Sequence, residues 1–481
     1  MDTFLSILHT IGLILIIIMF FNLMIFVHEL GHFLAGKWRG AYIDRFQIWF
    51  GKPIWSKTIG GVKWGIGWIP AGGFVSLPQL GDMEGIEGEA EIPKDLKPLK
   101  PLDKIIIAAA GPLFSLLLAY VFACIVWVAG KPVADIPGAR VGYVLPNSPA
   151  ATAGILPGDT ITAIDGKPVV KWAGNMEGVT DLIALSENEK INLTIERPQA
   201  DGSSTTLNIQ TTYTQEETAW WQRSSLRKIG IAPVMELMVG EVTPHSPAQR
   251  AGLKKGQKIT HVNGTPLLAT MTLNDATKDG KEAELTVQNT DGTIFTVKVT
   301  PAIPDNWKGH ADAKPLLGFN WDSPKKAVTL DYPSPQQQVN QSLAWMGVSL
   351  SAILAPNSSV GVEHLSGPIG IGSSMYSILE LPADRAWRIL LWFAVIINVN
   401  LAVLNFLPLP VVDGGHVVLG FAEMIKGKPV EGKFLNWLMT GFIFLILFMF
   451  IFVTFKDIGD HVGNDEESSL PPPVFSPPAQ P

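Results

Sequence analysis

The chain has 481 residues, of which 47% are hydrophobic and 16% are charged, a balance typical of a protein that contacts lipid. Its formal net charge is −7, and no cluster of Lys and Arg is interleaved with aromatic residues, which argues against a nucleic-acid partner. The single cysteine, Cys124, excludes a disulfide framework and a thiolate zinc site within one chain, so any metal must be held by His and carboxylate side chains.

Four apolar segments are long enough to cross a bilayer, because roughly 20 helical residues cover the ~30 Å of hydrocarbon. They lie in residues 1–37, 104–129, 383–412 and 434–456. The first segment is too long for a signal peptide, and it has neither a basic start nor a small-residue cleavage site. The sequence therefore predicts a polytopic α-helical membrane protein.

The short connections indicate an orientation, because Lys and Arg accumulate on the cytoplasmic side of a membrane. The connections after the first span (38–103) and after the third span (413–433) contain or adjoin these basic residues: Lys37, Arg39, Arg45, Lys52, Lys57, Lys63, Lys426, Lys428 and Lys433. We therefore predict that both connections are cytoplasmic. Both termini and the long insert between the second and third spans are then periplasmic, in a multi-pass protein of the bacterial inner membrane.

The insert contains a repeat. The segment PNSPAATAGILPGDTITAIDGKP begins at Pro146, and PHSPAQRAGLKKGQKITHVNGTP begins at Pro244. The shared pattern SPAxxAGxxxGxxIxxxxG resembles PDZ domains of the bacterial protease type, which implies two α/β PDZ domains over 130–232 and 233–305. Such a domain exposes a sheet edge to which an extended peptide or a free chain end adds as a strand. A duplicated scaffold without a ligand is the alternative.

Two segments outside the repeat have their own character. Residues 306–382 alternate apolar and polar stretches at helical spacing, which predicts an amphipathic helical segment at the outer membrane surface. Ordinary packing between the PDZ pair and the membrane domain would give the same pattern. Residues 457–481 end in PPPVFSPPAQP and are predicted to be a disordered proline-rich tail.

The motif HExxH lies at the cytoplasmic end of the first span, in the segment from His28 to His32. Residues i and i+4 share one helix face, so His28 and His32 can present ring nitrogens to one Zn²⁺ while Glu29 takes a proton from a metal-bound water. Three ionisable residues in an apolar span need such a reason, because charge is costly in lipid. The alternative is an interfacial cluster whose side chains only reach toward water.

A third zinc ligand must come from elsewhere in the chain. Ala35 and Arg39 stand where a soluble metzincin has Gly and a third His, so that family is excluded. A catalytic zinc site needs three protein ligands and one open position. The candidate is Asp413, because Pro408 and Pro410 break the third span at the depth of HExxH. The alternatives are that the aspartate only caps a helix, or that the third ligand is His416.

These motifs together identify a family. HExxH in the first span, a tandem PDZ insert and NxxPxPxxDGG in the third resemble the site-2 protease group of intramembrane metalloproteases, and the four-span layout resembles its bacterial sigma-E regulator proteases. The resemblance implies that His28, His32 and Asp413 bind Zn²⁺ and that Glu29 is the catalytic base. It also implies that Asn405 contacts substrate backbone or stabilises the oxyanion. From its own chemistry, Asn405 is a polar residue in a span, and an interhelical hydrogen bond would satisfy it.

Two positions depart from the family pattern. Val412 replaces the usual Leu before Asp-Gly, and Ser115 replaces the Asn of GPxxN in the second span. We therefore assign no role to Ser115.

Residues 60–77, GGVKWGIGWIPAGGFVSL, alternate apolar residues with Gly and predict a membrane-associated β-hairpin. Its edge could pair with a substrate and hold it extended, because a helical substrate hides its peptide bonds. Gly67, Pro70 and Gly72 suit a bend. The alternative is an interfacial hairpin that does not touch substrate.

The sequence thus predicts an intramembrane zinc metalloprotease that acts on single-pass membrane proteins after prior trimming on the outer side. The family resemblance implies that these substrates are a membrane-bound anti-sigma factor and remnant signal peptides. The alternatives are a PDZ-containing membrane scaffold or chaperone with a structural or inactive zinc site, and a metal transporter. More polar residues across the spans would be expected of a transporter.

Overall fold

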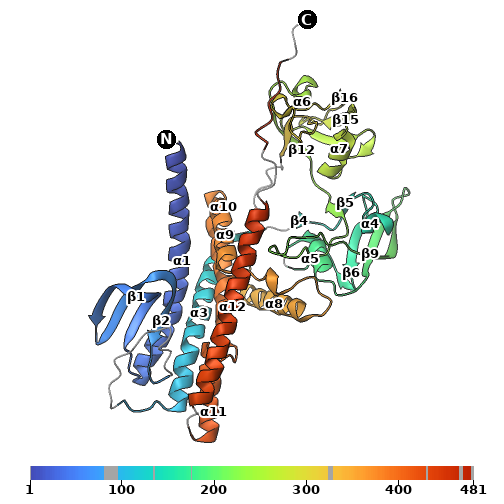
Figure 1. The fold of residues 1–481 in the computed structure, drawn as a ribbon. Coiled ribbons are helices and arrows are strands. Elements are labelled where there is room, and N and C mark those ends of the chain that lie inside the picture. The colour runs from blue at the N-terminus through green and yellow to red at the C-terminus, as the bar shows by residue number, and fades with distance from the viewer. Residues whose placement is uncertain are drawn as a thin grey trace. The chain divides into compact units, whose positions relative to one another are not determined.

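The computed structural model describes residues 2–80, 96–133, 136–174, 176–322, 329–428, 432–464 and 470–477. The chain divides into two compact units. Unit 1 comprises Met1–Pro132, Leu330–Val348 and Ser366–Asp457, and unit 2 comprises Val133–Thr329, Ser349–Leu365 and Ile458–Pro481. Figure 1 shows the elements of both units.

Unit 1 contains long apolar helices. They are α1 (Asp2–Arg39), α3 (Pro101–Ala129), α10 (Ala383–Phe406) and α12 (Gly432–Asn464). Within the described residues, 4 helices are long and apolar enough to span a membrane, as predicted. Large apolar side chains on α1 and α12 are exposed, for example Met19 at 72% and Phe444 at 66%, which suits surfaces that face lipid.

Helix α3 packs against both α1 and α10. Its small residues Ala119 and Ala123 are fully buried with Ala394 and Val395 of α10. Small side chains let helix backbones approach closely, which is how helices associate where lipid gives no hydrophobic driving force between them. The same close approach brings α3 against the HExxH turn of α1, where a Cβ on Gly31 would lie 2.4 Å from the carbonyl oxygen of Ala110.

The β-hairpin differs from the predicted one. Its strands are β1 (Arg45–Ile59) and β2 (Val62–Ser76), so residues 60–77 form the turn and only the second strand. The tight turn falls at Gly60 and Gly61, which both have positive φ, as two-residue hairpin turns require. The first strand was missed because Lys52, Lys57 and the surrounding polar residues interrupt its apolar pattern.

Strand β2 folds back on itself. Residues 45–48 pair on one side with Ser76 to Gly73 and on the other with Lys63 to Ile66, so the bend lies in residues 67–72. A Cβ on Gly67 would lie 2.3 Å from the carbonyl oxygen of Phe50, and Gly72 has a φ of +69°. Gly67 and Gly72, which suit a bend in the sequence, thus lie in the bend, where a side chain at either position would be crowded.

Each PDZ copy is built on a small antiparallel sheet in unit 2. The first copy contains β5 (Val141–Val144), α4 (Pro149–Thr152), β6 (Thr160–Ile164), β7 (Lys167–Pro168), α5 (Val179–Ala184), β9 (Ile191–Pro198), β10 (Ser204–Thr211) and β11 (Ile231–Pro233), beside the pair β4 (Ile136–Pro137) and β8 (Lys171–Ala173). The second contains β12 (Met238–Val242), α6 (Pro247–Arg250), β13 (Lys258–Val262), β14 (Thr265–Pro266), α7 (Thr270–Thr277), β15 (Ala283–Gln288), β16 (Ile294–Val299) and β17 (Phe319–Asp322).

The repeat seen in the sequence recurs in the local structure. Ser148 accepts a hydrogen bond from Ala151 N at 3.2 Å, and Ser246 accepts one from Gln249 N at 3.2 Å, so equivalent serines cap equivalent helices. The second copy does not end at residue 305 as predicted, because β17 pairs with β12 and closes the sheet. That strand lies after the repeated segment, which therefore carries no signal for it.

The remaining elements lie between the long helices and the PDZ copies in sequence, except that η1 lies within the second copy and α11 lies between α10 and α12. They are β3 (Lys131–Pro132), η1 (Asp305–Trp307), β18 (Leu330–Asp331), α8 (Pro335–Leu354), η2 (Val362–His364), α9 (Pro368–Leu379) and α11 (Asp413–Lys426). Helices α8 and α9 lie within residues 306–382, which were predicted to be an amphipathic helical segment, but the same range also contains β17 and β18. Strand β3 pairs with β18, Pro132 opposite Leu330, so the two ends of the intervening segment lie side by side.

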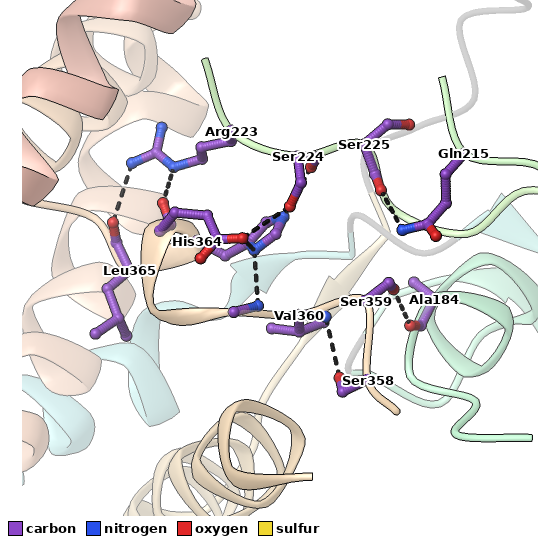
Figure 2. Close-up of polar contacts among 12 residues, drawn as sticks. Ala184, Gln215, Arg223, Ser224, Ser225, Ser358, Ser359, Val360, His364 and Leu365 are labelled. Carbon is purple, nitrogen blue, oxygen red and sulfur yellow. Dashed lines mark hydrogen bonds and ion pairs between the residues drawn. The ribbon is translucent and has the colours of Figure 1, made fainter. Parts of the chain in front are cut away.

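A cluster of hydrogen bonds holds residues 358–365 against the first PDZ copy (Figure 2). Arg223 Nε donates to the carbonyl of Glu363 at 2.7 Å, and its Nη2 donates to that of Leu365 at 3.0 Å. Ser359 Oγ donates to the carbonyl of Ala184 at 2.8 Å. Residues 358–365 and the first PDZ copy, although far apart in sequence, are thus packed together within unit 2.

The predicted disordered tail is partly ordered. Helix α12 continues to Asn464, and Pro471 and Pro472 accept hydrogen bonds from Trp307 and Asn306. The prediction for residues 465–469 and 478–481 lies outside the described residues. Proline content alone predicted disorder because the residues that hold the tail lie more than a hundred positions earlier in the chain.

Candidate metal centre

The HExxH turn of α1 presents two imidazoles side by side. His28 and His32 are buried, with exposures of 8% and 7%, and their Nε2 atoms lie 3.3 Å apart. Their other ring nitrogens are occupied, because Nδ1 of His28 lies 3.0 Å from Ser115 Oγ and Nδ1 of His32 lies 2.8 Å from the carbonyl oxygen of Ile107. Such partners fix each ring with Nε2 toward the metal.

Asp413 completes the cluster from the other end of the chain. Its Oδ2 lies 3.2 Å from His28 Nε2, and its Oδ1 lies 3.3 Å from His32 Nε2. For tetrahedral ligands bonded at about 2.0–2.1 Å, donor atoms stand about 3.3–3.4 Å apart. Two imidazoles and one carboxylate at this spacing therefore fit Zn²⁺, which the sequence predicted.

The helix-cap alternative for Asp413 is wrong. Helix α11 begins at Asp413, its N-cap is Val412, and no side chain makes a capping hydrogen bond. The carboxylate turns instead toward the imidazoles. Burial alone would raise the pKa of Asp413, but His32 and His28 hold that pKa below its ordinary value, so the carboxylate is ionised and ready to bind a cation.

The two prolines and the two glycines around Asp413 explain its position. Helix α10 ends at Phe406, just before Pro408, and the chain turns through Pro410 into α11. The predicted third span is thus shorter than residues 383–412. A Cβ on Gly414 would lie 2.2 Å from the carbonyl oxygen of Leu407, and one on Gly415 would lie 2.1 Å from that of Leu409. Only glycine allows this turn to close.

The cluster opens into a cavity of about 460 Å³. Its lining includes Glu29, Asn405 and His416 together with His28, His32, Asp413 and residues 72–75 of β2. Glu29 lies beside the β2 edge, since a Cβ on Gly73 would lie 3.6 Å from Glu29 Cγ. Gly72 lines this cavity, but Gly67 and Pro70 are not among its lining residues.

His416 does not join the group of three donors found among the described residues, which consists of His28, His32 and Asp413. Burial lowers the pKa of His416, which keeps its ring neutral within the cavity wall. The alternative of His416 as third ligand therefore has no geometric support.

Three contacts that position the ligands were not predicted from the sequence. Ser115 is fully buried against His28, although no role was assigned to it. Arg39 Nε donates to Asp103 Oδ1 at 2.7 Å and joins α1 to α3, and Lys104 Nζ lies 2.9 Å from Glu423 and joins α3 to α11. A basic and an acidic residue at the ends of different spans are the only sequence signal for the last two pairs.

Comparison with known proteins agrees with this geometry. The family model described as Peptidase family M50 matches residues 15–449. A Neisseria meningitidis protein is 29% identical over 457 residues, covering 92% of this chain and 97% of the relative. The regulator of sigma E protease of Haemophilus influenzae is 28% identical, covering 90% and 96%. The regulator of sigma-E protease of Escherichia coli is 28% identical, covering 89% and 94%.

Proposed function

The chain belongs to peptidase family M50 and is an intramembrane zinc metalloprotease, and from this premise we propose that it hydrolyses peptide bonds in or near the membrane segments of single-pass proteins. The observation that carries the proposal is the convergence of two imidazoles and a distant carboxylate on one point beside Glu29. We further propose, from the family resemblance described above, that the substrates include a membrane-bound anti-sigma factor trimmed beforehand on its outer side, and remnant signal peptides.

In this mechanism His28, His32 and Asp413 hold the metal. Bound zinc supplies a Lewis acid and a water that ionises near neutral pH. Glu29 would take a proton from the attacking water and give it to the leaving amine, and Asn405 would donate a hydrogen bond to the substrate backbone or to the developing oxyanion. A purely structural zinc site would need neither a carboxylate beside the cluster nor an open cavity.

The fold-back strand gives the substrate a place to lie. Residues 73–76 of β2 pair with residues 45–48 on one side, and residues 73–75 line the metal cavity. A substrate that adds to this edge as a strand would expose its peptide bonds next to Glu29. In this proposal Gly67, Pro70 and Gly72 form the bend that orients the edge. Only Gly72 of the three also lines the cavity.

The orientation is proposed from the basic residues flanking the spans. Lys63 lies on the hairpin and Lys167 on the first PDZ copy, and both are exposed. We expect an impermeant maleimide to label Lys167→Cys in spheroplasts, and Lys63→Cys only after lysis, with Cys124 of the parent chain giving the background. Labelling of Lys63→Cys in intact spheroplasts would reverse the orientation.

The mechanism is tested by replacing the proposed base. Glu29→Gln should reduce cleavage of a single-pass model substrate by about 10³-fold or more while the purified protein keeps zinc, because the three ligands remain. Exposed Glu380→Gln is the matched control and should cleave normally. Cleavage by Glu29→Gln at the control rate, or cleavage that survives complete removal of zinc by a chelator, would refute this mechanism, whereas absence of cleavage by the parent protein would favour the scaffold alternative.

A further inference from the structure

The C-terminal tail is bound by a short element of the second PDZ copy. Trp307 Nε1 donates to the carbonyl of Pro471 at 2.7 Å, and Asn306 Nδ2 donates to that of Pro472 at 2.9 Å. The backbone N–H of Asp305 donates to the carbonyl of Val474 at 2.8 Å. All three donors come from η1, so consecutive residues hold the tail.

The tail also donates to η1. Val474 N donates to Asn306 Oδ1 at 2.9 Å, and Ser476 N donates to Asp305 Oδ2 at 2.7 Å. Lys308 and Ser476 lower the pKa of Asp305 to about 2, so its carboxylate stays ionised and able to accept throughout the physiological pH range. Asn306 is thus bonded to the tail through both its donor and its acceptor atom.

The chemistry of these contacts suits proline. A proline-rich segment favours the extended polyproline conformation, which has no internal hydrogen bonds and leaves its carbonyls available to outside donors. Grooves that recognise such segments are lined by aromatic residues, and a buried indole N–H needs an acceptor. Trp307 is 8% exposed and meets that need through Pro471.

An apolar anchor follows the prolines. Phe475 is 6% exposed, whereas its neighbour Val474 is 55% exposed. A Cβ on Gly318 would lie 3.0 Å from Phe475 Cε2 and 2.3 Å from Ser246 Cβ, so the ring lies against the loop that leads into β17. Burial of a single aromatic side chain in an exposed tail indicates a built contact.

We propose that Asp305, Asn306, Trp307 and the Gly318 loop form a binding site for proline-rich segments, which the chain's own residues 471–476 occupy. The site is distinct from the metal centre and does not depend on the proposed hydrolysis.

Its position gives the tail a regulatory effect. Pro472 and Pro473 line a cavity of about 490 Å³ whose walls also include α7, through Leu273 and Thr277, residues 241–244, and residues 315–321, which lead into and include part of β17. Strand β17 is the last strand of its sheet, so its outer edge can accept an added strand. The bound tail closes one side of this groove and competes with any outside chain end that would enter there.

The test uses a labelled peptide of residues 468–481 and the full chain in detergent, intact or ending at Ser469. The shortened chain should bind the peptide saturably. The intact chain should bind it at least about tenfold more weakly, because its own tail acts at high effective concentration. Trp307→Phe in the shortened chain should weaken binding by about tenfold, through the loss of one buried hydrogen bond.

Two peptide variants keep the test independent of how the domain folds. A Phe475→Ala peptide should bind at least about tenfold more weakly, because the buried ring is lost, whereas Val474→Ala should bind nearly as well as the parent. In the intact chain, Phe475→Ala should also speed hydrogen exchange at the amides of Val474 and Ser476. Failure of the shortened chain to bind the peptide, or equal weakening by both alanine variants, would overturn the proposal.

Discussion

The hydroxyl of Ser115 supports the metal centre although it does not touch the metal. It lies 3.0 Å from Nδ1 of His28 and fixes the ring that presents Nε2 to Asp413. Removing a partner of a metal-binding imidazole typically weakens metal affinity by 10- to 100-fold.

We therefore expect Ser115→Ala to weaken zinc binding by about 10- to 100-fold in competition with a chelator, while cleavage is largely restored at saturating zinc. Ser115→Thr keeps the hydroxyl and is the matched control. Equal zinc affinity in the alanine and parent proteins would show that Ser115 only fills space.

Some of the residues at the metal centre and at the tail site could be predicted from the sequence, and others could not. HExxH and DGG each carry their chemistry within a few consecutive residues, so His28, His32 and Asp413 could be selected before their distances were known. Ser115 and Asn306 could not, because each acts on a partner far along the chain, and Ser115 stands where the sequence departs from the GPxxN pattern. Contacts between residues far apart in the chain leave no repeating pattern in the sequence from which they could be predicted.

The bend of β2 places strict limits on which residue can occupy position 72. Gly72 has a φ of +69°, and a Cβ there would lie 2.0 Å from the ring of Phe50. Both the backbone and the available space therefore require glycine, at a point that leads directly into residues 73–75 of the cavity wall.

We expect Gly72→Ala to lower kcat/KM by about 10²-fold while zinc stays bound, because a displacement of about 1 Å at a positioning edge has a cost of that order. Gly61→Ala is the control, since Gly61 also has a positive φ (84°) but nothing lies within 4 Å of its added Cβ. Equal losses in both variants would attribute the effect to general backbone strain.

One guanidinium makes several of the contacts between η2 and the first PDZ copy, beside those of Ser224 with Glu363 and His364. Arg223 donates to the carbonyls of Glu363 and Leu365 (Figure 2). It also pairs with Asp460.

Arg223→Ala should lower the local opening free energy of residues 361–365 by about 1.5–3 kcal/mol, because hydrogen bonds from a charged donor are lost. Hydrogen exchange at the amide of Leu365, which donates to Val362, measures the change. Arg250→Ala, which removes a guanidinium bonded to His245 in the second PDZ copy, should leave that amide unchanged. An unchanged hydrogen-exchange rate at the Leu365 amide in Arg223→Ala would show that Arg223 does not stabilise residues 361–365.

For the whole molecule, the sequence predicted the number of spans and the duplicated insert but not where the insert ends. A long apolar run directly indicates a membrane span, and a duplicated domain is visible as two similar segments of the sequence. Strand β17 lies beyond the repeat, and β1 is interrupted by Lys52 and Lys57, so each is defined by its pairing partner rather than by its own residues.

The pairing of Pro132 with Leu330 brings the two ends of the insert together, so a short turn can join them. We expect a chain in which a short Gly-Ser turn replaces residues 133–329 to keep zinc and to cleave a substrate with a long outer domain faster, relative to a trimmed one, than the intact chain does. This result follows if the PDZ pair excludes bulky substrates. An unchanged ratio of the two rates would show that the insert does not gate access.

The crowding around Gly414 and Gly415 gives a criterion for deciding which homologous sequences encode active enzymes. Carbonyl oxygens lie 2.2 Å and 2.1 Å from where their side chains would begin, so neither position accepts even alanine without moving the carboxylate beside it. A homologue that keeps HExxH and the aspartate but carries a larger residue at either following position should be classed as a pseudoenzyme. Motif scans that score only the three metal-binding residues would count such a gene as active.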